Sequence, residues 1–123
     1  MKKQILIADA DEQFCSELVA ALEGEESLEI MGVAKDGEEA LRLAGEKRSD
    51  VIILDLLLPQ CDGLSVLDAI TAMHSGCKAF VVTGFVSDYI MSALVSRRIS
   101  CLLRKPCSVQ RLVERVKEEL LPT

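Results

Sequence analysis

The chain is poor in several residue types that particular protein classes need. It has no tryptophan, one tyrosine, one histidine and only 3% aromatic residues, so an aliphatic core is expected. Its five cysteines include no Cys-x-x-Cys pair, and with a single histidine this spacing excludes the common zinc sites. Lys and Arg do not cluster and the net charge is −6, which argues against direct nucleic-acid binding by this segment.

Long hydrophobic runs are also missing. The first apolar stretch, residues 5–8, is too short for a signal peptide or a membrane span, so no membrane association is expected. An odd number of scattered cysteines is typical of free thiols in a reducing compartment, and we expect a cytoplasmic protein. A length of 123 residues fits one domain with one core, over residues 1–123.

Strand-like and helix-like patterns alternate along the whole chain. Short apolar runs typical of buried strands occupy residues 5–8, 30–34, 51–54, 79–82 and 101–103. Between them apolar residues recur at helical spacing, as at Cys15, Leu18, Val19 and Leu22. Five such units predict an α/β fold with a doubly wound, five-stranded, mostly parallel sheet.

Polar side chains follow the apolar runs, at the predicted carboxyl ends of the strands. They are Asp9 and Asp11 after the first run, Asp55 after the third, Thr83 after the fourth and Lys105 after the fifth. Parallel strands bring these ends to one edge of the sheet, where open α/β folds bind ligands. Carboxylate oxygens suit Mg²⁺, and a lysine and a hydroxyl can bind phosphoryl oxygens. Asp55 could then act as a nucleophile and form an aspartyl phosphate.

Taken singly, these residues have simpler interpretations. A polar residue after a buried strand commonly serves loop geometry, and Asp9 or Asp11 could cap the helix that follows. Their coincidence at the correct ends of the correct strands is much more specific than any one of them.

The order of these motifs resembles the receiver domain of bacterial response regulators, over nearly the whole chain. Residues 5–9 (ILIAD) match the first strand and its acidic loop, and residues 55–63 (DLLLPQCDG) match the segment Asp-x-x-x-Pro-x-x-Asp-Gly that begins at the phosphoacceptor. Residues 81–84 (VVTG) match the switch threonine, and Lys105-Pro106 matches a Lys-Pro pair whose peptide bond is typically cis. The resemblance implies the CheY-like, flavodoxin-like (βα)5 fold.

The resemblance implies a role for the polar residues at the sheet edge. Asp55 would accept a phosphoryl group from a histidine kinase or a histidine phosphotransfer protein, and Thr83 and Lys105 would bind its oxygens. The chain would be a phosphoacceptor of a two-component phosphorelay and not an enzyme. In the family, the residues two positions after the phosphoacceptor and two after the switch threonine flank the path of the attacking water. Here these residues are Leu57 and Phe85, and both are apolar. Because neither side chain can orient a water molecule, self-dephosphorylation is expected to be slow.

Mg²⁺ is implied as the cofactor, held by Asp9, Asp55 and the backbone carbonyl of Leu57. The family usually has a second acid directly after the first, and here that position is Ala10. Asp11 is a further candidate ligand, although its place before a helix also suits a cap. Mg²⁺ is therefore expected to bind more weakly than in a receiver with both acids.

Receivers of this family signal through the face formed by the fourth helix, the fifth strand and the fifth helix. This implies a homodimer through that face and control of transcription by a further domain, with this chain as the N-terminal part of a longer regulator. Leu102 stands where the family has a switch aromatic, and Arg98-Ile99 where it often has Gly-Ala. We therefore expect an output face of altered shape, without a swinging ring coupled to Thr83.

Other interpretations follow from the same residues. Ala10 would suit a pseudo-receiver that keeps the fold and the interaction face but does not take up phosphate. The pattern Asp9-Ala10-Asp11 also partly matches a haloacid-dehalogenase-type phosphatase, but the only acids after Lys105 are three glutamates of the last helix. Within the receiver family, residues 32–34, 37–39 and 62–67 are similar to the receiver of the sporulation master transcription regulator.

Some residues are expected to play no part in the chemistry. His74 is expected to be a solvent-exposed residue at a helix end, where a cation suits the helix dipole. Met73 and Met91 are expected to fill the core, and Arg97 and Arg98 to form a solvated helix end.

Overall fold

Strands and helices alternate strictly along the chain. The computed structural model describes residues 2–84 and 86–120, and these form five strands and five helices. The strands are β1 (Lys3–Ala8), β2 (Leu28–Ala34), β3 (Val51–Leu54), β4 (Lys78–Thr83) and β5 (Cys101–Arg104), and the helices are α1 (Glu12–Glu23), α2 (Gly37–Glu46), α3 (Gly63–Met73), α4 (Asp88–Val95) and α5 (Val109–Leu120).

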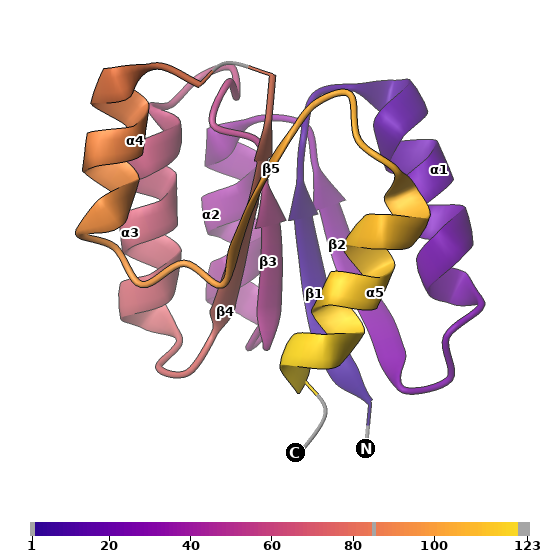
Figure 1. Cartoon of the computed structure of the whole chain (residues 1–123). Helices are drawn as coiled ribbons and strands as arrows, with labels where there is room; N and C mark the ends of the chain where they lie inside the picture. Colours follow the sequence, from indigo (N-terminus) through magenta and orange to yellow (C-terminus); the bar gives the residue numbers. More distant parts are fainter. Residues whose placement is uncertain (1, 85, 121–123) are drawn as a thin grey trace.

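All described strand pairs are parallel, and the sheet has the order β2-β1-β3-β4-β5. Helices α1 and α5 cover one face of the sheet, and α2, α3 and α4 cover the other (Figure 1). The carboxyl ends of the strands meet at the edge opposite the two chain termini (Figure 1). The predicted doubly wound α/β fold is confirmed.

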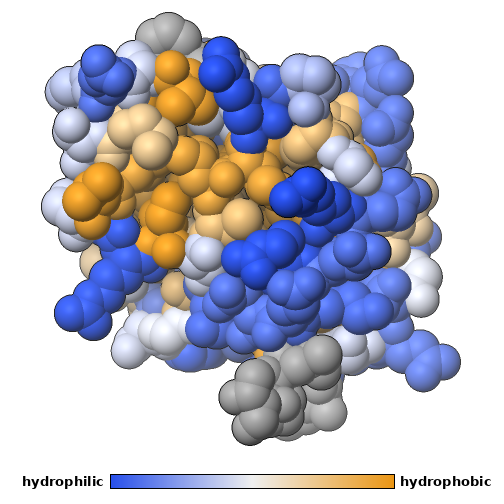
Figure 2. Space-filling model, in the orientation of Figure 1, coloured by the Kyte–Doolittle hydropathy of each residue, from blue (hydrophilic) through white to orange (hydrophobic). Residues whose placement is uncertain are grey.

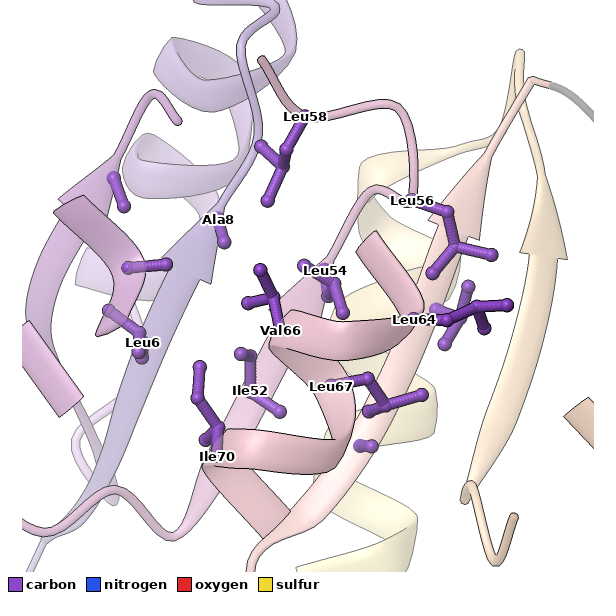
Figure 3. Packing of buried hydrophobic residues seen from close by; sticks show 14 of the residues in the cluster. Leu6, Ala8, Ile52, Leu54, Leu56, Leu58, Leu64, Val66, Leu67 and Ile70 are labelled. Atoms are coloured by element: carbon purple, nitrogen blue, oxygen red, sulfur yellow. The ribbon is translucent and has the colours of Figure 1, made fainter. Parts of the chain in front are cut away.

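The core has two halves because successive strand residues point to opposite faces. In β1, Ile5 and Ile7 pack under α1 and α5, while Leu6 and Ala8 pack under α2 and α3. Figure 3 shows the second half, where Val66 and Ile70 of α3 lie beside Ile52 and Leu54 of β3, in the same cluster as Leu67 and Leu6. Each fully buried Leu or Ile contributes roughly 1.5–3 kcal/mol, so these aliphatic layers supply most of the stability and need no tryptophan.

Helix caps fix where the helices begin. Asp36 accepts the N–H of Glu39 at 2.7 Å, while the Glu39 carboxylate reaches back to the N–H of Lys35 at 2.9 Å. This is a capping box with its return bond displaced by one residue. Ser108 caps α5 in the same way, because its hydroxyl accepts the N–H of Arg111 at 3.2 Å.

Several peripheral predictions were wrong. Met73 and Met91 are 46% and 43% exposed and do not fill the core. His74 is half-buried, with Nε2 2.7 Å from the carbonyl oxygen of Ala44. These residues lie on α3 and α4 or just beyond their ends, where the sequence pattern does not reveal which side a neighbouring helix covers. The solvated helix end expected at Arg97 and Arg98 is present, with Arg98 exposed beyond α4 and Arg97 paired at the surface with Asp68 by two N–O contacts of 2.8 and 2.9 Å.

Two global predictions can be checked on the described part of the chain. All five cysteines lie within it and are free thiols. No helix there combines the length and the apolar character that a membrane crossing needs.

Candidate functional site

Backbone hydrogen bonds that extend the sheet beyond its strands place three predicted site residues. The N–H of Asp9 donates to Ala34 O at 2.9 Å, and the N–H of Asp55 donates to Ala8 O at the same distance. The N–H of Lys105 donates to the carbonyl of Thr83 at 3.0 Å. Each acceptor is the last residue of a neighbouring strand, so the sheet itself sets where these side chains begin.

The side chains of Asp9, Asp55 and Lys105 meet at the carboxyl edge of the sheet. Lys105 Nζ lies 2.8 Å from Asp9 Oδ2 and 3.0 Å from Asp55 Oδ2. The other carboxylate oxygens accept backbone N–H groups, Asp9 Oδ1 from Asp11 at 2.8 Å and Asp55 Oδ1 from Leu57 at 2.9 Å. Asp9 and Asp55 are 2% and 8% exposed, so the carboxylates are oriented before any ligand arrives.

The electrostatics of this cluster follow from burial and charge pairing. Burial raises the pKa of Asp9, against the opposing effect of the Lys105 ammonium and the Asp11 N–H, and the nearby Asp55 raises it further. For Lys105, burial lowers the pKa, but hydrogen bonds to Asp9 and Asp55 outweigh it and the pKa is raised. The ammonium therefore stays charged and keeps two neighbouring carboxylates together.

Thr83 occupies the place that the sequence predicts. It is the last residue of β4 and is fully buried. The peptide bond that links Lys105 to Pro106 is cis, as the resemblance implies. Because β4 and β5 pair directly, Thr83 and Lys105 lie at the ends of adjacent strands.

The acidic loop after β1 begins the first helix, as the place of Asp11 suggested. Asp11 caps α1, with Oδ1 accepting the N–H of Phe14 at 3.1 Å, and its further role as a metal ligand stays a prediction. The side chain of Ala10 has no oxygen to offer a metal ion. Among residues 2–84 and 86–120, no group of three or more His, Cys, Asp or Glu side chains could hold a metal ion. Asp9 and Asp55 remain as the paired carboxylates that fit a cation which keeps much of its water.

Leu57 and Phe85 were predicted to slow the loss of a phosphoryl group. Leu57 is 60% exposed beside the site, and its N–H orients the Asp55 carboxylate. Phe85 lies outside the described residues. The expected slow self-dephosphorylation stays a prediction.

Two contacts at the site were missed from the sequence. The ring centroid of Phe14 lies 4.5 Å from Lys105 Nζ, and the Cys15 thiol donates to the carbonyl oxygen of Asp9 at 3.3 Å. The spacing of Phe14, Leu18 and Leu22 at four-residue intervals would have placed the ring on the buried face of α1. Its position over an ammonium could not have been found from spacing.

Comparisons with known proteins agree with this architecture. The chain is 34% identical over 116 residues to protein-glutamate methylesterase/protein-glutamine glutaminase 5 of Myxococcus xanthus, covering 90% of this chain and 33% of that protein. The chain thus spans about a third of the length of that curated relative. The narrower similarity to the sporulation regulator is not tested by this relative and stays a prediction.

Two solved structures show the same fold. One is a CheY-like response regulator receiver domain protein from Methanospirillum hungatei, with TM-score 0.89, 26% identity, and coverage of 98% of this chain and 94% of that one. The other is a response regulator from Burkholderia pseudomallei with a phosphorylated aspartic acid, a calcium ion and citrate. It has TM-score 0.80 and 26% identity, and the match covers 96% of this chain and 72% of that one.

The family model of the response regulator receiver domain matches residues 5–117. This range runs from β1 through most of α5 and contains Asp9, Asp55, Thr83 and Lys105. It favours a receiver over the phosphatase alternative. The chain belongs to the response regulator receiver domain family.

Proposed function

We propose that Asp55 is the phosphoacceptor of this receiver and takes a phosphoryl group from a histidine kinase or a histidine phosphotransfer protein. One observation carries the proposal: the buried Asp55 carboxylate lies 3.0 Å from the Lys105 ammonium at the carboxyl edge of the sheet. The phosphorylated aspartic acid of the Burkholderia pseudomallei relative supports it. Lys105 and Thr83 then bind phosphoryl oxygens.

The transfer needs a nucleophile and charge neutralisation. A carboxylate oxygen of Asp55 attacks phosphorus and forms a new P–O bond. The bond from phosphorus to the donor breaks, and its electron pair leaves on the imidazole nitrogen of a phosphohistidine or on the acetate oxygen of acetyl phosphate. Lys105 balances the negative charge that gathers on the phosphoryl oxygens, while the Leu57 N–H keeps Asp55 oriented.

A divalent cation belongs to the proposal as a weakly held cofactor. Asp9, Asp55 and the backbone carbonyl of Leu57 would hold Mg²⁺, which when bound would neutralise phosphoryl charge. The Lys105 ammonium now pairs with the same two carboxylates, so cation binding requires those oxygens to be shared.

The proposed output is a change in the face formed by α4, β5 and α5, which would form a homodimer and control transcription. Tyr89, Met91 and Val95 of α4 are 73%, 43% and 82% exposed. Figure 2 shows hydrophobic side chains gathered over α4 and toward β5, whereas the α5 side is hydrophilic. Such a surface supports a protein partner. No nucleic-acid contact by the segment itself is proposed.

The test is covalent labelling with acetyl phosphate and Mg²⁺. Wild type should gain one base-labile phosphoryl group, and Asp55→Asn should gain none, because an amide cannot attack phosphorus as a carboxylate does. Asp62→Asn is the matched control. Asp62 lies in the same loop, but its carboxylate caps α3, so this variant should still be labelled.

The pseudo-receiver alternative rests on Ala10 and predicts the opposite result. A folded wild-type protein that takes no label from acetyl phosphate or from a phosphohistidine donor would favour it. Undiminished labelling of Asp55→Asn would show that another residue is the acceptor.

A further inference from the structure

The Lys105 ammonium contacts an aromatic ring as well as its two charged partners. Besides Asp9 and Asp55, the ring of Phe14 has its centroid 4.5 Å from Nζ. A cation within about 6 Å of an aromatic centroid is attracted by the ring's quadrupole, and more strongly when water is excluded. The Lys105 side chain is 17% exposed and Phe14 is 8% exposed, so this contact is largely shielded from water.

Phe14 is itself held in place from two sides. Its N–H is bonded by the Asp11 cap in the first turn of α1, and its side chain belongs to the core cluster under α1 and α5. The Phe14 ring is therefore held in one position, and it limits the movement of the long and flexible Lys105 side chain beside it.

The Lys105 side chain also lines an adjoining depression into which its ammonium could turn. This depression of about 320 Å³ adjoins the ring and the ammonium, and it is lined by Phe14, Lys105, Asp11 and Glu17 among others. The two acids would attract an ammonium that left the site. A smaller side chain at position 14 would enlarge this space and remove the attraction of the ring.

We propose that Phe14 is a positioning residue whose ring holds the Lys105 ammonium between Asp9 and Asp55 and out of the adjoining depression. The inference rests on the proposed function, because the held ammonium is the group that binds a phosphoryl oxygen. In this proposal Phe14 acts on the phosphotransfer through Lys105.

The first experiment measures the position of the ammonium without any phosphotransfer. In NMR spectra the ε-methylene protons of Lys105 should give nuclear Overhauser contacts to the β protons of Asp9 and Asp55 in wild type and in Phe14→Trp. In Phe14→Leu, which keeps an apolar side chain but lacks the ring, these contacts should weaken or disappear. The contacts of Lys117, which pairs with Glu25 at 2.8 Å, should not change. Equally strong Lys105 contacts to Asp9 and Asp55 in wild type and Phe14→Leu would overturn the inference.

The second experiment measures phosphotransfer at saturating Mg²⁺. Phe14→Leu should lower the maximal labelling rate roughly 3- to 10-fold with little change in the half-saturating donor concentration, and Phe14→Trp should restore it. In a Lys105→Gln background, Phe14→Leu should have no further effect. If Phe14→Leu lowers the maximal labelling rate by the same factor in the Lys105→Gln background, Phe14 acts through packing and not through Lys105. That result would contradict the inference.

The two experiments separate this inference from the proposed function. A wild type that takes no label overturns the phosphoacceptor role and the catalytic part of the inference. The NMR contacts of Lys105 to Asp9 and Asp55 still decide whether the ring holds the ammonium.

Discussion

At the scale of single residues, position 10 sets the charge of the site. Asp9 and Asp55 already share one resident cation, Lys105, and Ala10 adds no third carboxylate. A hard cation such as Mg²⁺ gains affinity from each anionic oxygen ligand. The site as built should therefore take up Mg²⁺ weakly, in competition with the ammonium.

Ala10→Asp should tighten Mg²⁺ binding about 10-fold, the effect of one added charge-assisted contact. Titration calorimetry of both proteins would measure it. Ser16→Asp, on an exposed position of α1, adds the same charge away from the site and should change the affinity less than about 2-fold. Equal affinity before and after the Ala10 substitution would mean that another group already supplies the ligand.

At the scale of elements, the connection from β3 to α3 begins with Asp55 and forms one side of the site. Asp55 follows β3, and Gly63 opens α3 directly after its cap, Asp62. A Cβ atom built on Gly63 would lie 2.3 Å from the carbonyl oxygen and 2.6 Å from the Cα of Leu56. Backbone cannot yield as a flexible side chain does, so glycine is required for this loop to close over the site.

Gly63→Ala should destabilise the fold by about 1–3 kcal/mol, because the clash forces the loop away from α3. Gly45→Ala is the control, since nothing lies within 4 Å of its Cβ position in α2. That change should stabilise the fold by about 0.5–1 kcal/mol. Urea unfolding would measure both. A Gly63→Ala protein as stable as wild type would contradict the close packing of the loop.

The sequence predicts elements well where burial is complete. Strands β1, β3 and β4 are covered on both faces, so their apolar runs are unbroken and easy to find. Helix α4 is different, because among its residues, all described, Leu94 alone is fully buried. The sequence pattern predicts that an apolar residue such as Met91 is buried, yet Met91 is exposed on α4.

The same limit applies to the candidate site. Parallel topology places Asp9, Asp55, Thr83 and Lys105 at one edge, and this could be predicted because it depends on backbone direction alone. The ion pairs of Lys105 and its contact with Phe14 depend on side-chain torsions, which no linear pattern encodes.

At the scale of the whole molecule, the residues that stabilise the fold are separate from the residues of the candidate site. The two aliphatic half-cores lie on opposite faces of the sheet, while the polar cluster occupies only its carboxyl edge. The hydrophobic surface over α4 lies beside the hydrophilic surface of α5 on the face seen in Figure 2. Under the proposed function, a change at this edge would reach the surface over α4 without disturbing the two half-cores.

The most direct test of the account is to locate the phosphoryl group chemically. Borohydride reduces an aspartyl phosphate to homoserine, which marks the modified residue permanently. After acetyl phosphate and reduction, peptide mass spectrometry should find homoserine at position 55 and leave Asp9, Asp11 and Asp62 unchanged. Homoserine at another aspartate, or none in a folded protein exposed to both acetyl phosphate and a phosphohistidine donor, would contradict the assignment of Asp55.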